Sequence, residues 1–152
     1  MNASEILKTY FGYDSFRNGQ KEIIASILEG RDALAIMPTG AGKSVCYQVP
    51  ALLLSGITLV ISPLISLMQD QVHALNEAGI HAAFINSSLT ETQISKVLDL
   101  ARKAHTRFCM WRLKDWKVQD LYNLRSIRRF QWLRLMKRTV SHNGDRISDQ
   151  AI

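Results

Sequence analysis

Residues 32–44 read DALAIMPTGAGKS, and this stretch decides the fold. Its first part, Asp32–Met37, is short and almost entirely apolar, which is the pattern of a strand buried on both faces of a parallel sheet. Its second part supplies two glycines, a lysine and a serine, and we expect a helix to follow from about Val45 to Leu54. The order strand, glycine-rich turn, helix predicts a phosphate-binding loop.

The residues of this loop have the chemistry that a bound phosphate requires. Its glycines allow positive φ, so consecutive N–H groups can point into one concavity at a helix N-terminus. Lys43 can reach the β- and γ-phosphates of a nucleotide, and the Ser44 hydroxyl can ligate Mg²⁺. The general pattern has Gly where this chain has Met37, and the alternative is a glycine-rich turn with a surface lysine. The predicted phosphate-binding residues are Thr39, Gly40, Ala41, Gly42, Lys43 and Ser44.

The other elements of residues 1–102 alternate between helix and strand. Helical spacing of apolar residues predicts helices over 2–10, 21–28 and 64–75, and a capping box at Thr90–Gln93 predicts a fourth. Apolar runs predict further strands at 57–61 and 81–85. This order is typical of βαβ units, so we expect an α/β fold with a parallel sheet and flanking helices.

Composition divides the chain in two. The 152 residues carry a net charge of +6 and are 47% hydrophobic, which suits one globular domain and excludes collagenous or disordered classes. Residues 1–102 have a net charge of −2, and residues 103–152 have +8 and all three tryptophans. With no apolar run of about 18 residues we expect no membrane span. Two cysteines, Cys46 and Cys109, make a reducing cytoplasm the expected location.

Three motifs resemble those of RecQ-type DNA helicases in order and spacing. They are residues 11–20 (FGYDSFRNGQ), residues 37–44 (MPTGAGKS) and residues 62–71 (SPLISLMQDQ), and the resemblance covers 4–102. It implies an incomplete RecA-like P-loop domain over 1–102 and a family activity of ATP-driven 3′→5′ DNA unwinding. The implied cofactors are ATP and Mg²⁺, and the implied partner is single-stranded or partly duplex DNA.

The resemblance also assigns roles to individual residues. It implies that Lys43 stabilises the phosphates and that adenine is recognised by Tyr13, Arg17 and Gln20. A glutamine amide can bond adenine N6 and N7, and an aromatic ring and a guanidinium can sandwich the base. The implied DNA-backbone contacts are Ser62, Asn86 and Ser87. The alternatives are a surface hairpin for the first group and ordinary solvated turns for the second.

A RecQ-type enzyme also needs an Asp-Glu-Ala-His motif, which holds Mg²⁺ and positions the attacking water, and a second domain with an arginine finger. No Asp-Glu pair follows Ser44 in this chain. We therefore expect at most weak ATP binding and no helicase activity from these 152 residues. Two other classes stay open: a small P-loop phosphotransferase, and a non-enzymatic regulator that binds ATP and single strands.

Residues 103–152 form a poorly specified basic tail without sustained periodicity. Codons for residues 136–152, regrouped in the neighbouring reading frame, can encode DEAHCISQWGQDFRPSY. In the same frame, residues 130–135 can encode IPMVAV and residues 104–116 can encode GTYKILYVAPERLE. All three peptides resemble stretches of RecQ-type helicases. Our hypothesis is a single-base frameshift near Lys103. The alternative is a genuine basic arm that binds nucleic acid. Its phosphate contacts would be Lys114, Lys117, Arg125, Arg128, Arg129, Arg134, Lys137 and Arg138, and its stacking residues Trp111, Trp116 and Trp132.

Overall fold

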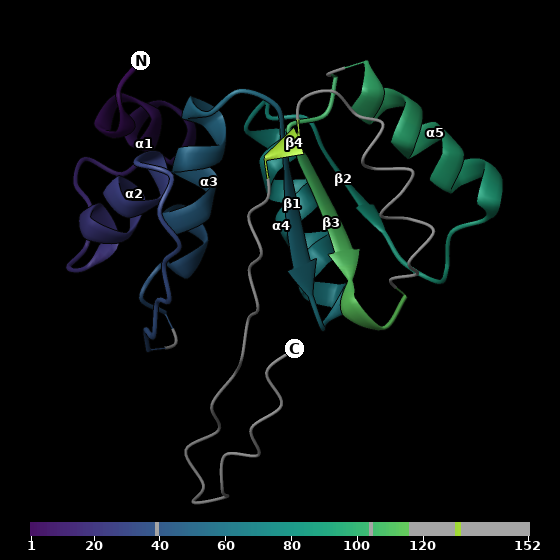
Figure 1. Cartoon of the computed structure of the whole chain (residues 1–152), viewed down its shortest axis with the longest axis horizontal. Coiled ribbons are helices and arrows are strands. Elements are labelled where there is room, and N and C mark those ends of the chain that lie inside the picture. Colours follow the sequence, from purple (N-terminus) through teal and green to yellow (C-terminus); the bar gives the residue numbers. More distant parts are fainter. Residues whose placement is uncertain (39, 104, 116–129, 132–152) are drawn as a thin grey trace, which may run out of the picture.

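A computed structural model describes residues 1–38, 40–103, 105–115 and 130–131 of the chain (Figure 1). Helices flank a parallel sheet, as the sequence predicts. The helices are α1 (Ala3–Phe11), α2 (Gln20–Leu28), α3 (Lys43–Leu53), α4 (Ile65–Glu77) and α5 (Glu91–Arg102), with a 3₁₀ turn η1 (Leu113–Asp115). The strands are β1 (Ile57–Ser62), β2 (Ala82–Ile85), β3 (Phe108–Arg112) and β4 (Phe130–Gln131).

The sheet has the strand order β2-β3-β1-β4, and every pairing in it is parallel. Its centre is β1 and β3, whose residues pair from Thr58 with Phe108 to Ser62 with Arg112. All six residues of β1 are buried, which agrees with the apolar run that predicted this strand. The parallel register brings the carboxyl ends of β1, β2 and β3 to one edge of the sheet.

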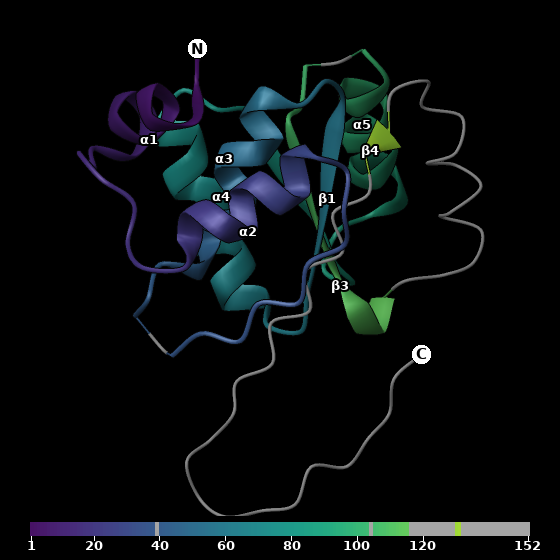
Figure 2. The same ribbon diagram turned by 60° about the vertical axis from the view of Figure 1, so that its left-hand side comes forward.

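Helices cover both faces of the sheet (Figures 1 and 2). Leu98 of α5 packs on one face with β1 residues such as Leu59. Met68 of α4 packs on the other face with Val60 and Met110, in a cluster that α3 also joins. The clusters on the two faces are separate because successive side chains along β1 and β3 point to opposite faces of the sheet. A third cluster joins α1, α2 and α3.

Local sequence signals explain where several helices begin and end. The predicted capping box is present at α5, where the Thr90 side chain accepts from the Gln93 N–H and Gln93 reaches back to the Thr90 N–H. A second capping box, Asn2 with Glu5, opens α1. Gly12, with φ +70°, ends α1 in a left-handed conformation and donates its N–H to helix carbonyls.

Two predictions from local pattern are wrong. Residues 32–37 form no strand, and Leu34 and Ile36 are 93% and 87% exposed. A strand needs neighbours, and β1 pairs with β3 on one side and with β4 on the other, so the apolar run has no place beside it. Conversely, Phe108–Arg112 forms a central strand although the pattern after residue 103 shows no periodicity.

Candidate functional site

The predicted phosphate-binding loop leads directly into α3. Gly42 precedes the helix with φ +75°, and Gly40 has φ +82°, so both take the left-handed conformation that glycine tolerates best. A Cβ at position 42 would lie 2.6 Å from Nε2 of Gln20, so the Gln20 side chain would have to shift to accommodate it. Lys43 and Ser44 are the first two residues of α3, at the positive end of the helix dipole. Thr39 lies outside the described residues.

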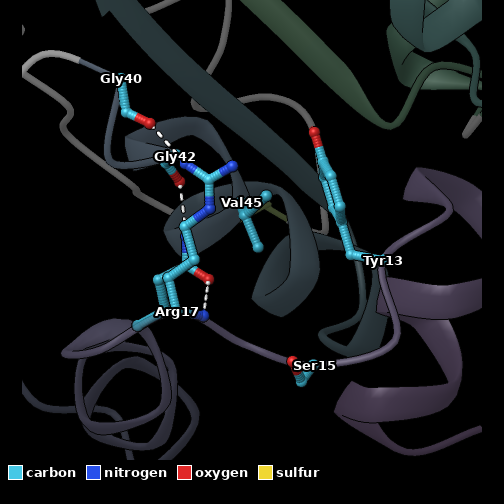
Figure 3. Close-up of a pocket in the computed structure, with 7 residues that line it drawn as sticks. Tyr13, Ser15, Arg17, Gly40, Gly42 and Val45 are labelled. Atoms are coloured by element: carbon cyan, nitrogen blue, oxygen red, sulfur yellow. Dashed lines mark hydrogen bonds between the residues drawn. The ribbon is translucent and has the colours of Figure 1, made fainter.

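The predicted adenine motif contacts the loop itself (Figure 3). Gln20 is 3% exposed, and its Nε2 donates to the carbonyl oxygens of Ala41 and Gly42, both at 3.1 Å. Its Oε1 accepts the Arg17 N–H at 2.9 Å. The Arg17 guanidinium donates from Nη1 to the Gly40 carbonyl at 2.5 Å. The start of α2 and the loop before α3 are therefore one hydrogen-bonded unit.

These residues line a small cavity. It encloses about 130 Å³ between Tyr13, Ser15, Arg17, Gln20, Gly40, Gly42 and Val45. Pockets that take whole drug-sized ligands measure roughly 300–1,000 Å³, so this space suits one part of a nucleotide, such as its base. Tyr13 is 50% exposed at the rim and has an accessible ring face. The structure thus gathers all three predicted adenine residues beside the loop.

Gln20 differs from its predicted role in one respect. Its amide carries two N–H donors, and both are engaged by loop carbonyls in this conformation. Bidentate recognition of adenine would require Gln20 to exchange those partners for the base. In this structure the side chain instead fixes the backbone of the loop.

The Ser44 hydroxyl contacts α4. It accepts a hydrogen bond from Nε2 of Gln71 at 3.1 Å, and the Tyr47 hydroxyl donates to Oε1 of Gln71 at 2.8 Å. Burial raises the pKa of Tyr47 to about 12, and hydrogen bonds to Ser44 and Gln71 lower it in part. Tyr47 is therefore a protonated donor at neutral pH. Within the described residues Lys43 has no ion-pair partner, so its charge is available to a phosphate.

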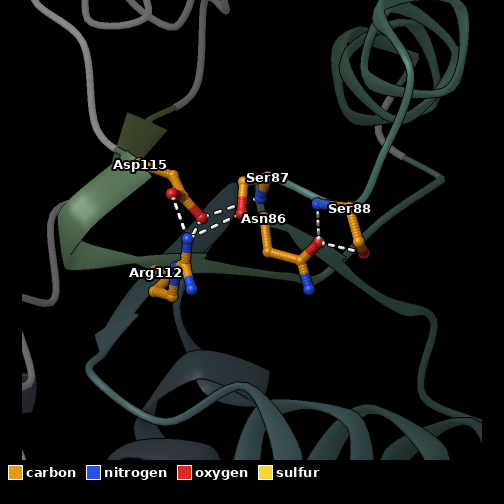
Figure 4. A network of polar contacts seen from close by, with 5 residues as sticks. All are labelled: Asn86, Ser87, Ser88, Arg112 and Asp115. Carbon is orange, nitrogen blue, oxygen red and sulfur yellow. Dashed lines mark hydrogen bonds and ion pairs between the residues drawn. The ribbon is translucent and has the colours of Figure 1, made fainter.

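The predicted DNA contacts lie together at the carboxyl edge of the sheet. Ser62 ends β1, and its register partner Arg112 ends β3. Asn86 and Ser87 follow β2 directly, and the Ser87 hydroxyl accepts a hydrogen bond from Nη2 of Arg112 at 2.6 Å (Figure 4). Ser62 is 5% exposed and its Oγ accepts the Leu64 N–H at 3.5 Å, whereas Ser87 is exposed.

A carboxylate already occupies the donors at this edge. Asp115 accepts the Ser87 backbone N–H at 2.8 Å and Nε of Arg112 at 2.6 Å, and it forms a second contact with the same guanidinium. The Arg112 hydrogen bond holds the pKa of the Asp115 carboxyl below its usual range, and the Ser87 N–H acts in the same direction. Asp115 therefore engages the donors of both Ser87 and Arg112 at this edge.

Asn86 is placed for structure more than for contact. It is 1% exposed, and its Oδ1 accepts from the backbone N–H and the hydroxyl of Ser88 at 2.9 and 2.6 Å. Its Nδ2 is buried and has no hydrogen-bond partner among the described residues. The side chain builds the turn that presents Ser87 at the edge.

Sequence reasoning missed Gln71, Arg112 and Asp115 at these sites. Gln71 was visible as a polar residue in the 62–71 motif, but its contact with Ser44 depends on how α4 packs beside α3. The register of β1 with β3 is what brings Arg112 to the edge. The basic-arm residues from position 116 onward lie outside the described part of the chain, apart from residues 130–131, and Trp111 is buried in β3 rather than free to stack on a base.

The structure also describes the cysteines, two histidines and Leu64. Cys46 and Cys109 are free and buried, as expected for Cys46. His73 and His81 are exposed, and no group of three or more His, Cys, Asp or Glu in the described residues could hold a metal. In the described part no helix is both long and apolar enough to cross a bilayer. Leu64, the first residue of the predicted helix over 64–75, is 53% exposed.

Comparison with known proteins gives the family. The chain is similar to several proteins named ATP-dependent DNA helicase RecQ. The protein of Haemophilus influenzae is 59% identical over 95 residues, which are 62% of this chain and 15% of the relative. The protein of Bacillus subtilis is 57% identical over 98 residues, which are 64% of this chain and 17% of the relative. It is also 46% identical over 97 residues to ATP-dependent DNA helicase Q-like 5 of Arabidopsis thaliana, 64% of this chain and 10% of the relative.

The chain therefore spans less than a fifth of the length of these relatives. The family model described as DEAD/DEAH box helicase matches residues 17–129, which include Arg17 and Gln20, the predicted phosphate-binding loop and the first three strands of the sheet. This match covers well over half of the 152 residues. The chain belongs to the DEAD/DEAH box helicase family, and its similarity is to the RecQ members.

Proposed function

We propose that this chain binds ATP and Mg²⁺ at the loop before α3, as the nucleotide-binding part of a RecQ-like 3′→5′ DNA helicase. The observation that carries the proposal is the hydrogen-bonded unit of Arg17 and Gln20 with the loop carbonyls, which places a base-sized cavity next to a phosphate cradle. The loop leads into the N-terminus of α3, where backbone N–H groups and the helix dipole favour an anion.

Each residue has a role in this proposal. Lys43 and the loop amides hold the phosphates, and Tyr13 and Arg17 enclose the base. Gln20 exchanges its loop carbonyls for adenine. Ser44 is the Mg²⁺ ligand on this chain. Magnesium sites in nucleotide-binding proteins combine few protein ligands with phosphate oxygens and water, so one hydroxyl at the helix start fits that role. When bound, Mg²⁺ would neutralise phosphate charge.

The proposed partner is single-stranded or partly duplex DNA, held at the carboxyl edge of the sheet. Ser62 and Ser87 lie at that edge beside Arg112. A backbone phosphate would have to displace the Asp115 carboxylate to reach the Ser87 N–H and the Arg112 guanidinium. Asn86 supports the turn that presents Ser87. Such contacts follow the backbone without reading base sequence.

We also propose that the message is out of frame after about Lys103, so that 1–102 is the genuine domain segment and 103–152 is not. The apolar run Phe108–Trp111 supports this, because it stands where the neighbouring frame encodes ILYV, another apolar strand-forming run. The nucleotide sequence tests it: codons for 136–152 that cannot regroup to Asp-Glu-Ala-His refute it. Without that motif, we expect this chain to bind ATP and to show no helicase activity. The two free cysteines support a cytoplasmic location.

ATP turnover of the purified chain, with and without single-stranded DNA, tests the function. We expect binding without turnover. Turnover stimulated by DNA would show a more complete motor than proposed, and turnover indifferent to DNA would favour a phosphotransferase. An absence of ATP binding refutes the proposal. A chain that binds DNA but no nucleotide would be a single-strand-binding regulator.

A further inference from the structure

Three side chains on two helices form a cluster next to the loop, in which Tyr47 is buried and Ser44 and Gln71 are half-buried. Ser44 and Tyr47 lie three residues apart on one side of α3, and Gln71 reaches them from α4. The Gln71 amide bridges the two hydroxyls: Nε2 donates to Ser44 Oγ at 3.1 Å, and Oε1 accepts from Tyr47 at 2.8 Å. Tyr47 is 1% exposed, so its ring cannot move without opening the core.

This bridge restricts what the Ser44 hydroxyl can do. A serine oxygen has two acceptor lone pairs and one proton. The N–H of Gln71 takes one lone pair and holds the side chain in one orientation, which leaves one lone pair for a cation. The Tyr47 hydroxyl occupies the oxygen end of the Gln71 amide, so the nitrogen end faces Ser44, and Tyr47 also hydrogen-bonds to Ser44 itself.

No charged side chain of the described residues forms a hydrogen bond with this cluster, so its effect on Ser44 is one of orientation and not of charge. Gln69 offers a comparison on the same helix, because it is the same residue type but is exposed. It lies two residues from Gln71, so the two side chains do not share a helix face.

We propose that Gln71, held by Tyr47, is a positioning residue that orients the Ser44 hydroxyl to ligate Mg²⁺. The proposal rests on the proposed function, in which this site binds a Mg²⁺–nucleotide complex. It adds a role for α4, the helix that begins three residues after the predicted DNA contact Ser62. Gln71 touches neither nucleotide nor metal and acts only through Ser44.

The test is the Mg²⁺ dependence of nucleotide binding by the full chain. A fluorescent ATP analogue is titrated in excess Mg²⁺ and again in EDTA, for the parent chain and for Gln71→Leu, Tyr47→Phe and the control Gln69→Leu. Loss of a net hydrogen bond corresponds to a loss of about 2- to 10-fold in affinity. We expect Gln71→Leu to lose this factor in Mg²⁺ and to bind as the parent does in EDTA.

Tyr47→Phe removes one oxygen and keeps the buried ring, so it is expected to fold and to lose a smaller factor, again only with Mg²⁺. Gln69→Leu is expected to match the parent in both conditions. Equal losses in Mg²⁺ and EDTA would show a merely structural role and overturn the proposal, as would an unchanged Gln71→Leu. If the parent binds no analogue in either condition, the proposed function fails first. If it binds equally well in both, Ser44 is no Mg²⁺ ligand and this inference fails alone.

Discussion

The Gly42→Ala substitution tests how the adenine motif and the loop depend on each other. A methyl group at position 42 would lie 2.6 Å from Nε2 of Gln20, which is 3% exposed and donates to two loop carbonyls. The flexible amide can move aside only by giving up those two hydrogen bonds. At about 0.5–1.5 kcal/mol each, they amount to about 1–3 kcal/mol.

Backbone strain adds to this loss. Position 42 has φ +75°, and a residue with a Cβ in the left-handed region costs about 1–2 kcal/mol. We therefore expect Gly42→Ala to lower the free energy of unfolding by about 2–5 kcal/mol. Gly40→Ala is the matched control, because Gly40 has φ +82° with no atom within 4 Å of the added Cβ. Its expected loss is the strain alone, about 1–2 kcal/mol.

Urea unfolding of both variants, and of each combined with Gln20→Ala, measures these losses. On the Gln20→Ala background the clash and the two hydrogen bonds are absent already, so Gly42→Ala should cost no more than Gly40→Ala. A double-mutant cycle then gives a coupling of about 1–3 kcal/mol between positions 20 and 42. Equal losses at positions 40 and 42, with additive effects of Gln20→Ala, would refute the reasoning.

The other predictions concern the edge of the sheet, a helix cap and a thiol. Asp115→Asn removes the charge that occupies the Ser87 and Arg112 donors, so we expect tighter binding of a fluorescent single strand, measured by anisotropy; weaker or equal binding contradicts this. Because the pKa of Asp115 is lowered, its carboxylate is charged at neutral pH and holds the Ser87 and Arg112 donors. It loses that charge as the pH falls through the folded-state pKa, so the single-strand affinity of the parent chain should approach that of Asp115→Asn as the pH is lowered. Thr90→Ala should cost about 1 kcal/mol in urea unfolding, and Thr90→Ser little. Burial raises the pKa of Cys109 to about 12, so a thiol reagent at pH 8 should label it only after denaturant is added; rapid labelling of the native chain would contradict its burial.

Local chemistry was sufficient to predict most helices and two strands. The capping box at Thr90 and the apolar spacing of 64–75 describe interactions within a few residues, and the structure confirms both helices. The run 57–61 is apolar on both faces, and the structure buries it on both. Such elements carry their signal in their own residues.

Elements that depend on distant partners were not predictable in this way. Asp32–Met37 has the composition of a central strand, but a strand also needs a free edge, and none beside β1 is left for it in the described sheet. Phe108–Trp111 shows the reverse: four consecutive buried residues lack a period of two, yet they are typical of a strand covered on both faces. Residues 108–111 are an apolar run of the kind that predicted 57–61, but the search for periodicity after residue 103 passed over it, and the pairing with β1 and β2 shows that it is a strand.

The residues of the candidate site also divide into those with a local sequence signal and those that depend on distant contacts. The glycines, Lys43 and Ser44 were predicted because the phosphate cradle is a local feature of a turn and a helix start. The contact between Gln20 and the loop joins residues more than twenty positions apart, and that between Gln71 and Ser44 joins residues 27 positions apart. Neither has a signal in the spacing of the sequence.

Equilibrium binding of ATP in the presence of Mg²⁺ is the most direct measurement of the central claim, that the loop before α3 holds a nucleotide. The pair to compare is Lys43→Ala and Lys96→Ala, since Lys96 lies on α5, outside the site. We expect the parent chain and Lys96→Ala to bind ATP with the same affinity and Lys43→Ala to lose at least about tenfold, the equivalent of one charge-assisted contact. Binding that survives unchanged in Lys43→Ala, or no binding by the parent chain, would contradict it.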